Sequence, residues 1–422
     1  MPRINFPMIV KIRQKYKAPF IKDIKNELSK IIANSKLRER IKRNDKVAIT
    51  AGSRGISHIA EIIATVVKEI KDLGGDPFIV PSMGSHGEAT SEGQTTVLKS
   101  YGITENFVVA PIRSSMEVVK IGEMMEGVPV LMDKIAFNSD AIIAVNRVKP
   151  HTSYSSSVES GLMKMLAVGL GKHAGACLVH SFGSRGLREM VPQAARIMLK
   201  EANVVLGIAI IENAYDQTAK MVAVEPEDFE KVEPGLLKEA YQLMPRLPFD
   251  EIDLLIVDEI GKNISGTGMD TNIIGRLMIR GEKEFEKPRV DKIVALDLTS
   301  ESHGNAIGIG LADITVRRLV KKINYQATYA NVLTSGFLNR ANIPPTFETD
   351  KDAIATALET LRRIEPAKAR VVRIQNTLAL ETIYISEILL KEAEENENIE
   401  IIGNINQMLF DSKGNLLGGD YA

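Results

Sequence analysis

The chain has 422 residues, of which 44% are hydrophobic and 25% are charged, so its composition is that of an ordinary globular protein with apolar material for more than one core. Lys and Arg total 53 against 54 Asp and Glu, and the formal charge of −1 excludes the global basic excess of a dedicated nucleic-acid-binding protein. The single cysteine, Cys177, excludes an intrachain disulfide and a Cys-x-x-Cys zinc site.

Membrane and export signals are the next classes to consider. The longest apolar run, residues 204–211, is far shorter than the ~20 residues that span a bilayer. The N-terminus lacks the apolar core and small-residue cleavage site of a signal peptide. We therefore expect a cytoplasmic protein in a reducing environment, with no membrane partner.

The first 45 residues are rich in Lys and Arg and poor in acids. Within them, apolar residues recur at three- and four-residue steps, which is the pattern of a helix that buries one face and solvates its lysines on the other. These residues are Ile21, Ile24, Leu28, Ile31 and Ile32. The pattern predicts a basic helical lead-in over residues 1–45, whose charges are best interpreted as a solvated helix face.

From Lys46 the pattern changes to short β-branched runs, glycine-rich turns and long amphipathic stretches, which is typical of α/β proteins. Residues 46–50 predict a buried strand, residues 59–73 a helix, and residues 77–80 the next strand, which together make a βαβ unit. Further strands are expected at residues 107–110, 141–145 and 204–211.

A second series of strands follows the Pro-Arg-Leu-Pro sequence at residues 245–248. Its expected strands are residues 252–257, 293–298 and 399–402. The sequence thus predicts two α/β domains with mostly parallel sheets and a cofactor cleft between them: an N-terminal domain over residues 1–247 and a C-terminal domain over residues 250–422. The tail, residues 405–417, is typical of a hairpin, and the sequence leaves open which domain it packs against.

Polar residues cluster just after the predicted strands of the first domain. Arg54 follows the first strand in a Gly-x-x-Gly turn, His86 follows the second between Gly84 and Gly87, and His151 follows the strand at 141–145. Ligands of open α/β sheets bind outside the carboxyl ends of the strands, so these side chains are expected at one rim.

Each of these residues has a functional and an ordinary interpretation. Arg54 has the geometry to hold a carboxylate or phosphate bidentately, or it pairs with a surface acid. His86 and His151 suit proton transfer, because imidazole both accepts and donates protons near neutrality, although single loop histidines are most often simply solvated.

The segment from Ser160 to His180 is the most informative part of the sequence. Lys164 lies among apolar and small residues, where desolvation lowers the pKa of an amine and makes it nucleophilic, or where the side chain snorkels to solvent. His180 follows an apolar triplet and suits a metal ligand, as does His173. One histidine and Cys177 do not complete a tetrahedral site, so a metal here needs ligands from a cofactor or substrate.

In their order along the chain, His86, His151, Lys164 and His180 resemble the N-terminal domain of the nickel-pincer-nucleotide lactate racemase family, of which the chain looks like a divergent member. The resemblance covers roughly residues 46–186. It implies that His86 and His151 are the catalytic histidines, that Lys164 carries the cofactor covalently, and that His180 binds nickel. Arg54 is similar to the family's substrate-binding arginine.

The chain departs from the family at several positions. Ala51 stands where the family has an acid, and the family's Gly-Gly-x-Lys turn is here Ser160-Gly-Leu-Met-Lys164. In the second domain the expected Gln and Lys are not found after the Gly-rich loop. Within that loop we expect Ser265 and Gly266 to bind the cofactor, and Asp297, Thr299, Ser300 and His303 are further candidates because they follow a predicted strand.

The resemblance implies a cofactor and a reaction. The cofactor is a pyridinium-3,5-bisthiocarboxylic acid mononucleotide that holds nickel through two sulfurs and a ring carbon, with His180 as the protein ligand. The reaction inverts C2 of a 2-hydroxyacid: one histidine removes the hydroxyl proton while the hydride passes to the cofactor, and the hydride returns to the opposite face of the planar ketoacid. Arg54 would clamp the substrate carboxylate, and the partners are the small substrate and the cofactor-biosynthesis proteins.

Two other functions remain open from the residues alone. A conventional α/β oxidoreductase or phosphate-ligand enzyme would use Arg54 and its Gly turn without nickel. A non-catalytic nucleic-acid or assembly factor would use the basic lead-in, and its binding would fall steeply with salt.

Overall fold

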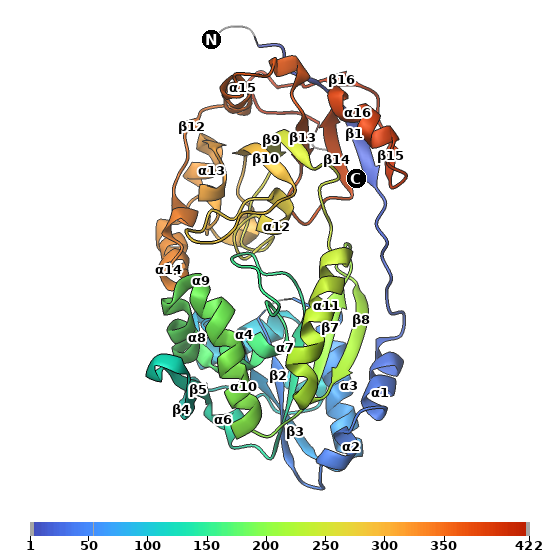
Figure 1. Cartoon of the computed structure of the whole chain (residues 1–422), viewed down its shortest axis with the longest axis vertical. Helices are drawn as coiled ribbons and strands as arrows, with labels where there is room; N and C mark the ends of the chain where they lie inside the picture. Colours follow the sequence, from blue (N-terminus) through green and yellow to red (C-terminus); the bar gives the residue numbers. More distant parts are fainter. Residues whose placement is uncertain (1–3, 54, 419–422) are drawn as a thin grey trace. The chain divides into compact units, whose positions relative to one another are not determined.

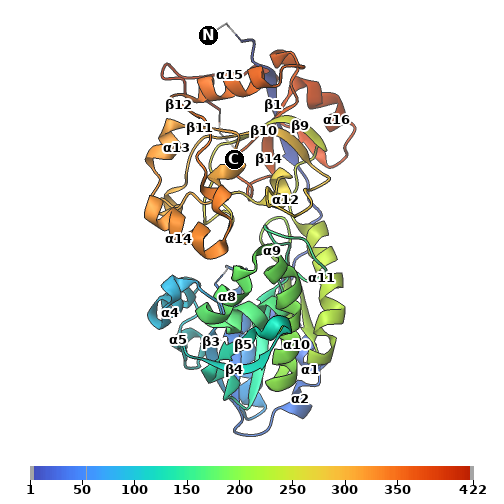
Figure 2. The ribbon, with the colours of Figure 1, turned by 60° about the vertical axis from the view of Figure 1, so that its left-hand side comes forward.

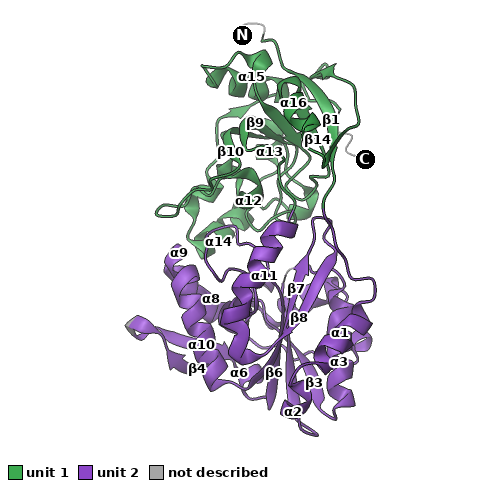
Figure 3. Cartoon of the chain, turned by 45° about the vertical axis from the view of Figure 1, so that its right-hand side comes forward, with its two compact units in different colours: residues 1–16, 245–422 green, residues 17–244 purple. Residues whose placement is uncertain are grey.

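The computed structural model describes residues 4–53 and 55–418. The chain forms two compact units, one of residues 17–244 and one of residues 1–16 with 245–422 (Figure 3). The sequence-based division assigned the first 16 residues to the N-terminal domain instead. The unit of residues 17–244 has a mainly parallel five-stranded sheet and a small two-stranded sheet, and the other unit has a nine-stranded sheet in which five strands are parallel, so the chain is an α/β protein as predicted.

The unit of residues 17–244 is built on a five-stranded sheet (Figure 1). Its strand order is β3 (Asp76–Pro81), β2 (Lys46–Ala51), β6 (Ala141–Arg147), β7 (Val204–Glu212) and β8 (Thr218–Val224). The first four strands are parallel, and β8 is antiparallel to β7. The strands expected at 46–50, 77–80, 141–145 and 204–211 are therefore confirmed.

Alternating side chains give this sheet two buried faces. Ile49 and Ile143 belong to the core that α1 (Ile24–Ala33) and α3 (Ile59–Asp72) cover. Their neighbours Ala48 and Ile142 belong to the core on the opposite face. Both expected helices, including the amphipathic one of the basic lead-in, are confirmed, and each is amphipathic because its apolar residues face the sheet.

Helices from the middle of the chain cover the second face, and Figure 2 shows α8 and α10 in front of the strands. They are α7 (Leu162–Lys164), a π-helical segment (Met165–Leu170), α8 (Lys172–Ser181), α9 (Gly183–Arg185), a second π-helical segment (Gly186–Met190), α10 (Val191–Glu201) and α11 (Phe229–Leu243). Among the described residues, no single helix is long and apolar enough to cross a membrane; only the pair 162–170 and 172–181, bent by 109°, has the length and composition together. That pair contributes Leu166, Leu170 and Val179 to the buried core.

The smaller elements of this unit are α2 (Leu37–Arg40), α4 (Ser91–Ser100), α5 (Glu105–Val108), β4 (Val118–Glu123), β5 (Pro129–Asp133) and α6 (Lys134–Phe137). The prediction of a strand at residues 107–110 is wrong, because residues 105–108 form one turn of helix. The Thr104 hydroxyl accepts a hydrogen bond from the Phe107 backbone N–H at 3.3 Å, which caps that turn.

The other unit contains a nine-stranded sheet. Strands β12, β11, β10, β9 and β13 lie side by side in this order and are parallel to one another. β14 is antiparallel to β13, and β1 is antiparallel to β14, β15 and β16. The strands are β1 (Met8–Gln14), β9 (Glu251–Val257), β10 (Arg289–Ala295), β11 (Ile314–Val316), β12 (Thr346–Phe347), β13 (Val371–Ile374), β14 (Thr382–Ser386), β15 (Ile399–Ile401) and β16 (Asn406–Gln407). Its helices are α12 (Thr271–Ile274), α13 (Arg317–Lys321), α14 (Tyr325–Ser335), α15 (Asp350–Thr360) and α16 (Leu390–Glu394).

Strand β1 corrects the expectation of a helical lead-in that begins at residue 1. Its apolar side chains Val10 and Ile12 are buried, and Ile12 pairs with Ile383 of β14 on one side and Ile401 of β15 on the other. The alternation of apolar and basic residues over 8–14 has the two-residue period of a half-buried strand. The tail also belongs here, because Asn406 pairs with Ile9 of β1.

Candidate functional site

The carboxyl ends of three neighbouring strands, β3, β2 and β6, lie at one edge of the sheet in the unit of residues 17–244. The segment that carries Lys164 passes along this edge. A Cβ placed on Gly52, just after β2, would lie 3.2 Å from the Met165 methyl carbon. The Asn146 side chain at the end of β6 donates a hydrogen bond to the Gly161 carbonyl at 2.7 Å. The strand ends and the Lys164 segment therefore form one site.

The loop after β3 carries His86. Its Nδ1 forms a hydrogen bond with the Ser53 hydroxyl of the loop after β2, so two strand-end loops meet at this ring. The loop turns through Gly84 and Gly87, which both have positive φ. At Gly87 a Cβ would lie 2.6 Å from the Gln94 backbone N, so glycine is required for the close approach to α4.

The loop after β6 carries His151. The two ends of this loop are joined by a hydrogen bond from the Lys149 backbone N–H to the Ser160 carbonyl at 2.8 Å. The His151 Nδ1 accepts a hydrogen bond from the Ser153 backbone N–H at 3.0 Å, so the neutral ring carries its proton on Nε2. The ring centroid lies 4.6 Å from that of buried Tyr154. The imidazole is thus held by a hydrogen bond at one edge and by an aromatic neighbour.

Glu159, at the end of the same loop, holds His151 by its main chain. The Glu159 carboxylate accepts the His151 backbone N–H at 2.6 Å and the Ser156 backbone N–H at 3.0 Å. The Tyr241 hydroxyl of α11 donates to the same carboxylate at 3.2 Å. Burial raises the pKa of Glu159 to about 7, and the nearby positive charge of Lys164 is among the opposing effects.

Lys164 and His180 lie close enough to interact electrostatically. The pKa of His180 is lowered to about 4, first because burial disfavours the imidazolium and second because the Lys164 ammonium repels it. At neutral pH the His180 ring is therefore uncharged and has a nitrogen lone pair, the form that coordinates a metal. The positive charge of Lys164 thus lowers the pKa of both His180 and Glu159. Glu159 in turn bonds the main chain of the His151 loop.

The backbone before Lys164 is fixed by a second buried acid, Glu233 of α11. Its carboxylate accepts the Met163 backbone N–H at 3.0 Å, at the positively polarised start of the helical segment that carries Lys164. A Cβ on Gly161 would lie only 2.4 Å from a Glu233 carboxylate oxygen, so glycine is needed there. Burial raises the pKa of Glu233 to about 7.

Sequence reasoning missed Glu159, Glu233 and Tyr241. Glu159 and Glu233 are buried and Tyr241 is partly buried, and all three are recognised by partners in the folded chain. The local sequence signals none of them except through Gly161, whose small size fits a close neighbour. Arg54, the expected carboxylate clamp, lies outside the described residues.

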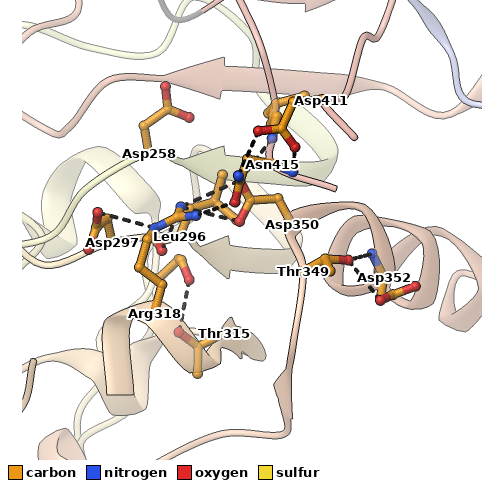
Figure 4. Close-up of polar contacts among 12 residues, drawn as sticks. Asp258, Leu296, Asp297, Thr315, Arg318, Thr349, Asp350, Asp352, Asp411 and Asn415 are labelled. Atoms are coloured by element: carbon orange, nitrogen blue, oxygen red, sulfur yellow. Dashed lines mark hydrogen bonds and ion pairs between the residues drawn. The ribbon is translucent and has the colours of Figure 1, made fainter. Parts of the chain in front are cut away.

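The expected residues of the second domain lie in the other unit. The buried Ser265 hydroxyl is 3.2 Å from that of Thr267, and the Gly266 carbonyl accepts a hydrogen bond from the Lys262 ammonium at 2.9 Å. Asp297 forms an ion pair with Arg318 at 3.2 Å, which Figure 4 shows, and a second with Lys322 at 2.7 Å. The proposed use of Ser265 and Gly266 with the Lys164 cluster stays a prediction.

The remaining candidates have local partners in their own unit. The Thr299 hydroxyl donates to the Asn263 side-chain amide oxygen at 2.6 Å and lies 2.6 Å from the Ser302 hydroxyl. The Ser300 hydroxyl donates to the carboxylate of its neighbour Glu301 at 3.0 Å. His303 lies at positive φ directly after a short 3-10 helix.

Metal ligation has few protein donors here. Over residues 4–53 and 55–418, no group of three or more His, Cys, Asp or Glu side chains is arranged to hold a metal ion. The Cys177 Sγ lies 3.6 Å from Nδ1 of His173, one turn earlier on α8. A cavity of about 430 Å³ lined by Lys46, Phe78 and Arg113 contains none of the expected site residues in its wall.

The sequence model of the lactate racemase N-terminal domain matches residues 8–173, which include His86, His151 and Lys164. Over that stretch, which is less than half of the chain, the sequence is similar to the lactate racemase N-terminal domain. The similarity supports a racemase-type isomerase in general terms. His180 lies beyond the matched range.

Among solved structures, the lactate racemase apoprotein from Thermoanaerobacterium thermosaccharolyticum aligns at 10% sequence identity, over 89% of this chain and 94% of that chain, with a TM-score of 0.48. Among curated proteins, none matches the sequence.

Proposed function

We propose that the protein is a racemase or epimerase that inverts C2 of a 2-hydroxyacid with a covalently held nickel-pincer nucleotide, in the cytoplasm. The observation that carries this proposal is that the loops of His86 and His151 and the segment of Lys164 meet at the carboxyl ends of β3, β2 and β6, where Asn146 bonds the Gly161 carbonyl and Ser53 bonds the His86 ring. A lysine that can be acylated, a neutral imidazole and proton carriers are the groups that such a reaction requires.

The residues present fit the proposed cofactor. The neutral imidazole of His180 is a metal donor near Lys164, and within residues 4–53 and 55–418 no set of three or more protein ligands is arranged for a metal, so nickel would take its other ligands from the cofactor itself. Lys164 would hold the group covalently, and acylation of its amine would remove the positive charge that now repels a proton from His180. When bound, the group supplies hydride acceptance and return, which side chains do not provide.

The proton chemistry falls to His86 and His151. The hydrogen bond from the Ser153 N–H to Nδ1 of His151 leaves Nε2–H as the proton-bearing atom, so this ring is set to donate first. The Ser53 hydroxyl bonded to Nδ1 of His86 either donates or accepts, so this ring can present Nε2 as a base. Inversion needs one proton carrier on each side of the carbon, and two separate strand-end loops provide two carriers.

The remaining parts of the proposal concern residues beyond this cluster. We assign the substrate carboxylate to Arg54, and further cofactor contacts to Ser265 and Gly266. The cofactor-biosynthesis proteins are the expected partners, because this group is made elsewhere and delivered to the apoprotein.

The test is intact-mass spectrometry with nickel analysis on protein produced together with the cofactor's biosynthetic enzymes. The proposal expects one adduct and about one nickel per chain. Lys164→Arg, which keeps the charge but lacks the nucleophilic amine, should lose the adduct, whereas His180→Ala should keep the adduct and lose nickel. Unmodified wild-type protein under these conditions would contradict the proposal.

A further inference from the structure

A fully buried lysine lies behind the His86 loop and takes no part in the function proposed above. Lys172, the first residue of α8, is 0% exposed, and its Nζ donates to the Pro81 carbonyl at 2.8 Å and to the Gln94 side-chain oxygen at 2.6 Å. Asp133, also buried, lies 3.5 Å away as the compensating charge. Burial of a charged amine is costly and is tolerated only when several partners compensate it.

Gln94 connects Lys172 to the His86 loop by hydrogen bonds. Its side chain is fully buried, and its Nε2 donates to the Gly84 carbonyl at 2.9 Å and to the His86 carbonyl at 3.2 Å. An amide is suited to this position because its oxygen accepts from the ammonium while its nitrogen donates to both carbonyls. Figures 1 and 2 both show α4, which carries Gln94, next to α8.

The backbone at Lys172 supports a specific need for this side chain. Lys172 has φ +53°, a left-handed conformation that favours glycine. The neighbouring residues Gly169, Gly171 and Gly175 show that glycine is common in this segment. A lysine in a backbone conformation that favours glycine indicates that the contacts of its ammonium group with Pro81, Gln94 and Asp133 compensate the cost of that conformation.

We propose that Lys172 and Gln94 are positioning residues for His86, in which the buried ammonium fixes the amide and the amide fixes the two carbonyls on either side of the turn that carries the imidazole. This role rests on the proposed function of His86 as a proton carrier. Neither residue touches the reacting atoms; they act by holding the His86 loop against α4.

Three variants separate positioning from simple stability. Lys172→Met keeps the length of the side chain but removes the anchor and leaves Asp133 without its cation. Lys172→Met/Asp133→Asn removes both charges and keeps an acceptor for the Ile135 and Ala136 N–H groups that Asp133 caps at 2.8 Å each. Gln94→Glu keeps an acceptor for Lys172 but donates to neither loop carbonyl.

Two measurements report on His86 itself. The first is nitrogen-15 NMR of the imidazoles in unloaded protein with labelled histidine; the chain has six histidines, and the His86 signal is the one lost in His86→Gln. The second is steady-state racemisation by loaded protein, separated into kcat and KM. Thr65→Val is the matched control, because it removes a buried hydroxyl bonded only within α3.

The proposal expects all three variants to shift or broaden the His86 signal and to lower kcat by about 10- to 100-fold with little change in KM, as a misplaced proton carrier does. The double variant should recover the decrease in melting temperature caused by Lys172→Met, but its His86 signal should not return to the wild-type position. A wild-type His86 signal in the double variant and in Gln94→Glu would overturn the proposal. If loaded wild-type protein does not racemise, the proposed function fails, and the NMR experiment still decides the positioning role.

Discussion

The Glu159 carboxylate accepts the backbone N–H of His151 at 2.6 Å, across a loop closed by the Lys149–Ser160 pair. The same carboxylate accepts the Ser156 N–H and the Tyr241 hydroxyl. One buried acid therefore organises the loop that presents a proposed proton carrier, and Lys164 contributes to the electrostatic environment of that acid.

Glu159→Gln should destabilise the protein although it preserves side-chain shape. Glutamine offers one acceptor oxygen, so its amide nitrogen would face a backbone or hydroxyl donor, at a cost of about 1–3 kcal/mol. Urea denaturation followed by circular dichroism measures the loss. Tyr241→Phe is the matched control, because it removes one donor and should cost only about 1 kcal/mol. Equal effects of the two changes would argue against a central role for Glu159.

Glu233 should make stability depend on pH in a defined direction. Because its pKa rises from 4.5 to about 7 on folding, the folded protein binds the proton more tightly than the unfolded chain. The contribution of Glu233 to the free energy of unfolding is roughly 3 kcal/mol. It is fully present below pH 4.5 and is lost as the pH rises to about 7. His180 acts in the opposite sense, because its pKa falls on folding and its contribution is lost as the pH falls toward 4.

The Glu233 effect is isolated by comparison with Glu233→Gln. The difference in unfolding free energy between wild type and variant should fall as the pH is raised from 4.5 to 7, measured by urea denaturation at several pH values. A difference that stays constant over this range would show that Glu233 titrates normally.

Gly161→Ala should disturb the Lys164 segment. The new Cβ would lie 2.4 Å from a Glu233 carboxylate oxygen, so either the acid or the backbone must move, at about 1–3 kcal/mol. Gly235→Ala, two residues from Glu233 on α11, meets no atom within 4 Å and should stabilise by about 0.5–1 kcal/mol. Thermal melting of the two proteins compares the effects, and a neutral Gly161→Ala would indicate that Glu233 is not rigidly placed.

Strand β1 should be essential to the unit that contains residues 245–422. Ile12 is fully buried between β14 and β15, so Ile12→Ala should cost about 2–4 kcal/mol. Lys15→Ala, which removes an exposed ion pair with Glu400 at 3.5 Å, should cost under about 1 kcal/mol. Hydrogen exchange of β14 peptides locates the effect: increased exchange is expected in Ile12→Ala, and unchanged exchange would contradict the role of β1.

The sequence predicted the parallel strands well where apolar β-branched residues were continuous. The strands at 46–51 and 204–212 are buried on both faces, so their composition alone marks them. Strand β1 escaped prediction because its alternating lysine and arginine side chains resemble a solvated helix face. Residues 107–110 were misassigned because a short apolar run fits a strand and a capped turn equally well.

The site was predictable to the extent that its residues follow strand ends. That rule brought out Arg54, His86 and His151, whereas Lys164 was singled out by its apolar and small neighbours, and the proposed roles of all four stay predictions. It did not bring out Glu159, Glu233, Lys172 or Gln94, because a buried acid, amine or amide is recognised by partners that only the folded chain assembles.

The most direct test of the account is a chiral assay of 2-hydroxyacids with protein that carries both the Lys164 adduct and nickel. Starting from either pure enantiomer of a substrate, the account predicts conversion toward the same equilibrium mixture, with His86→Gln and His151→Gln each abolishing it. Fully loaded protein that leaves every enantiomer in a broad panel unchanged would contradict the account.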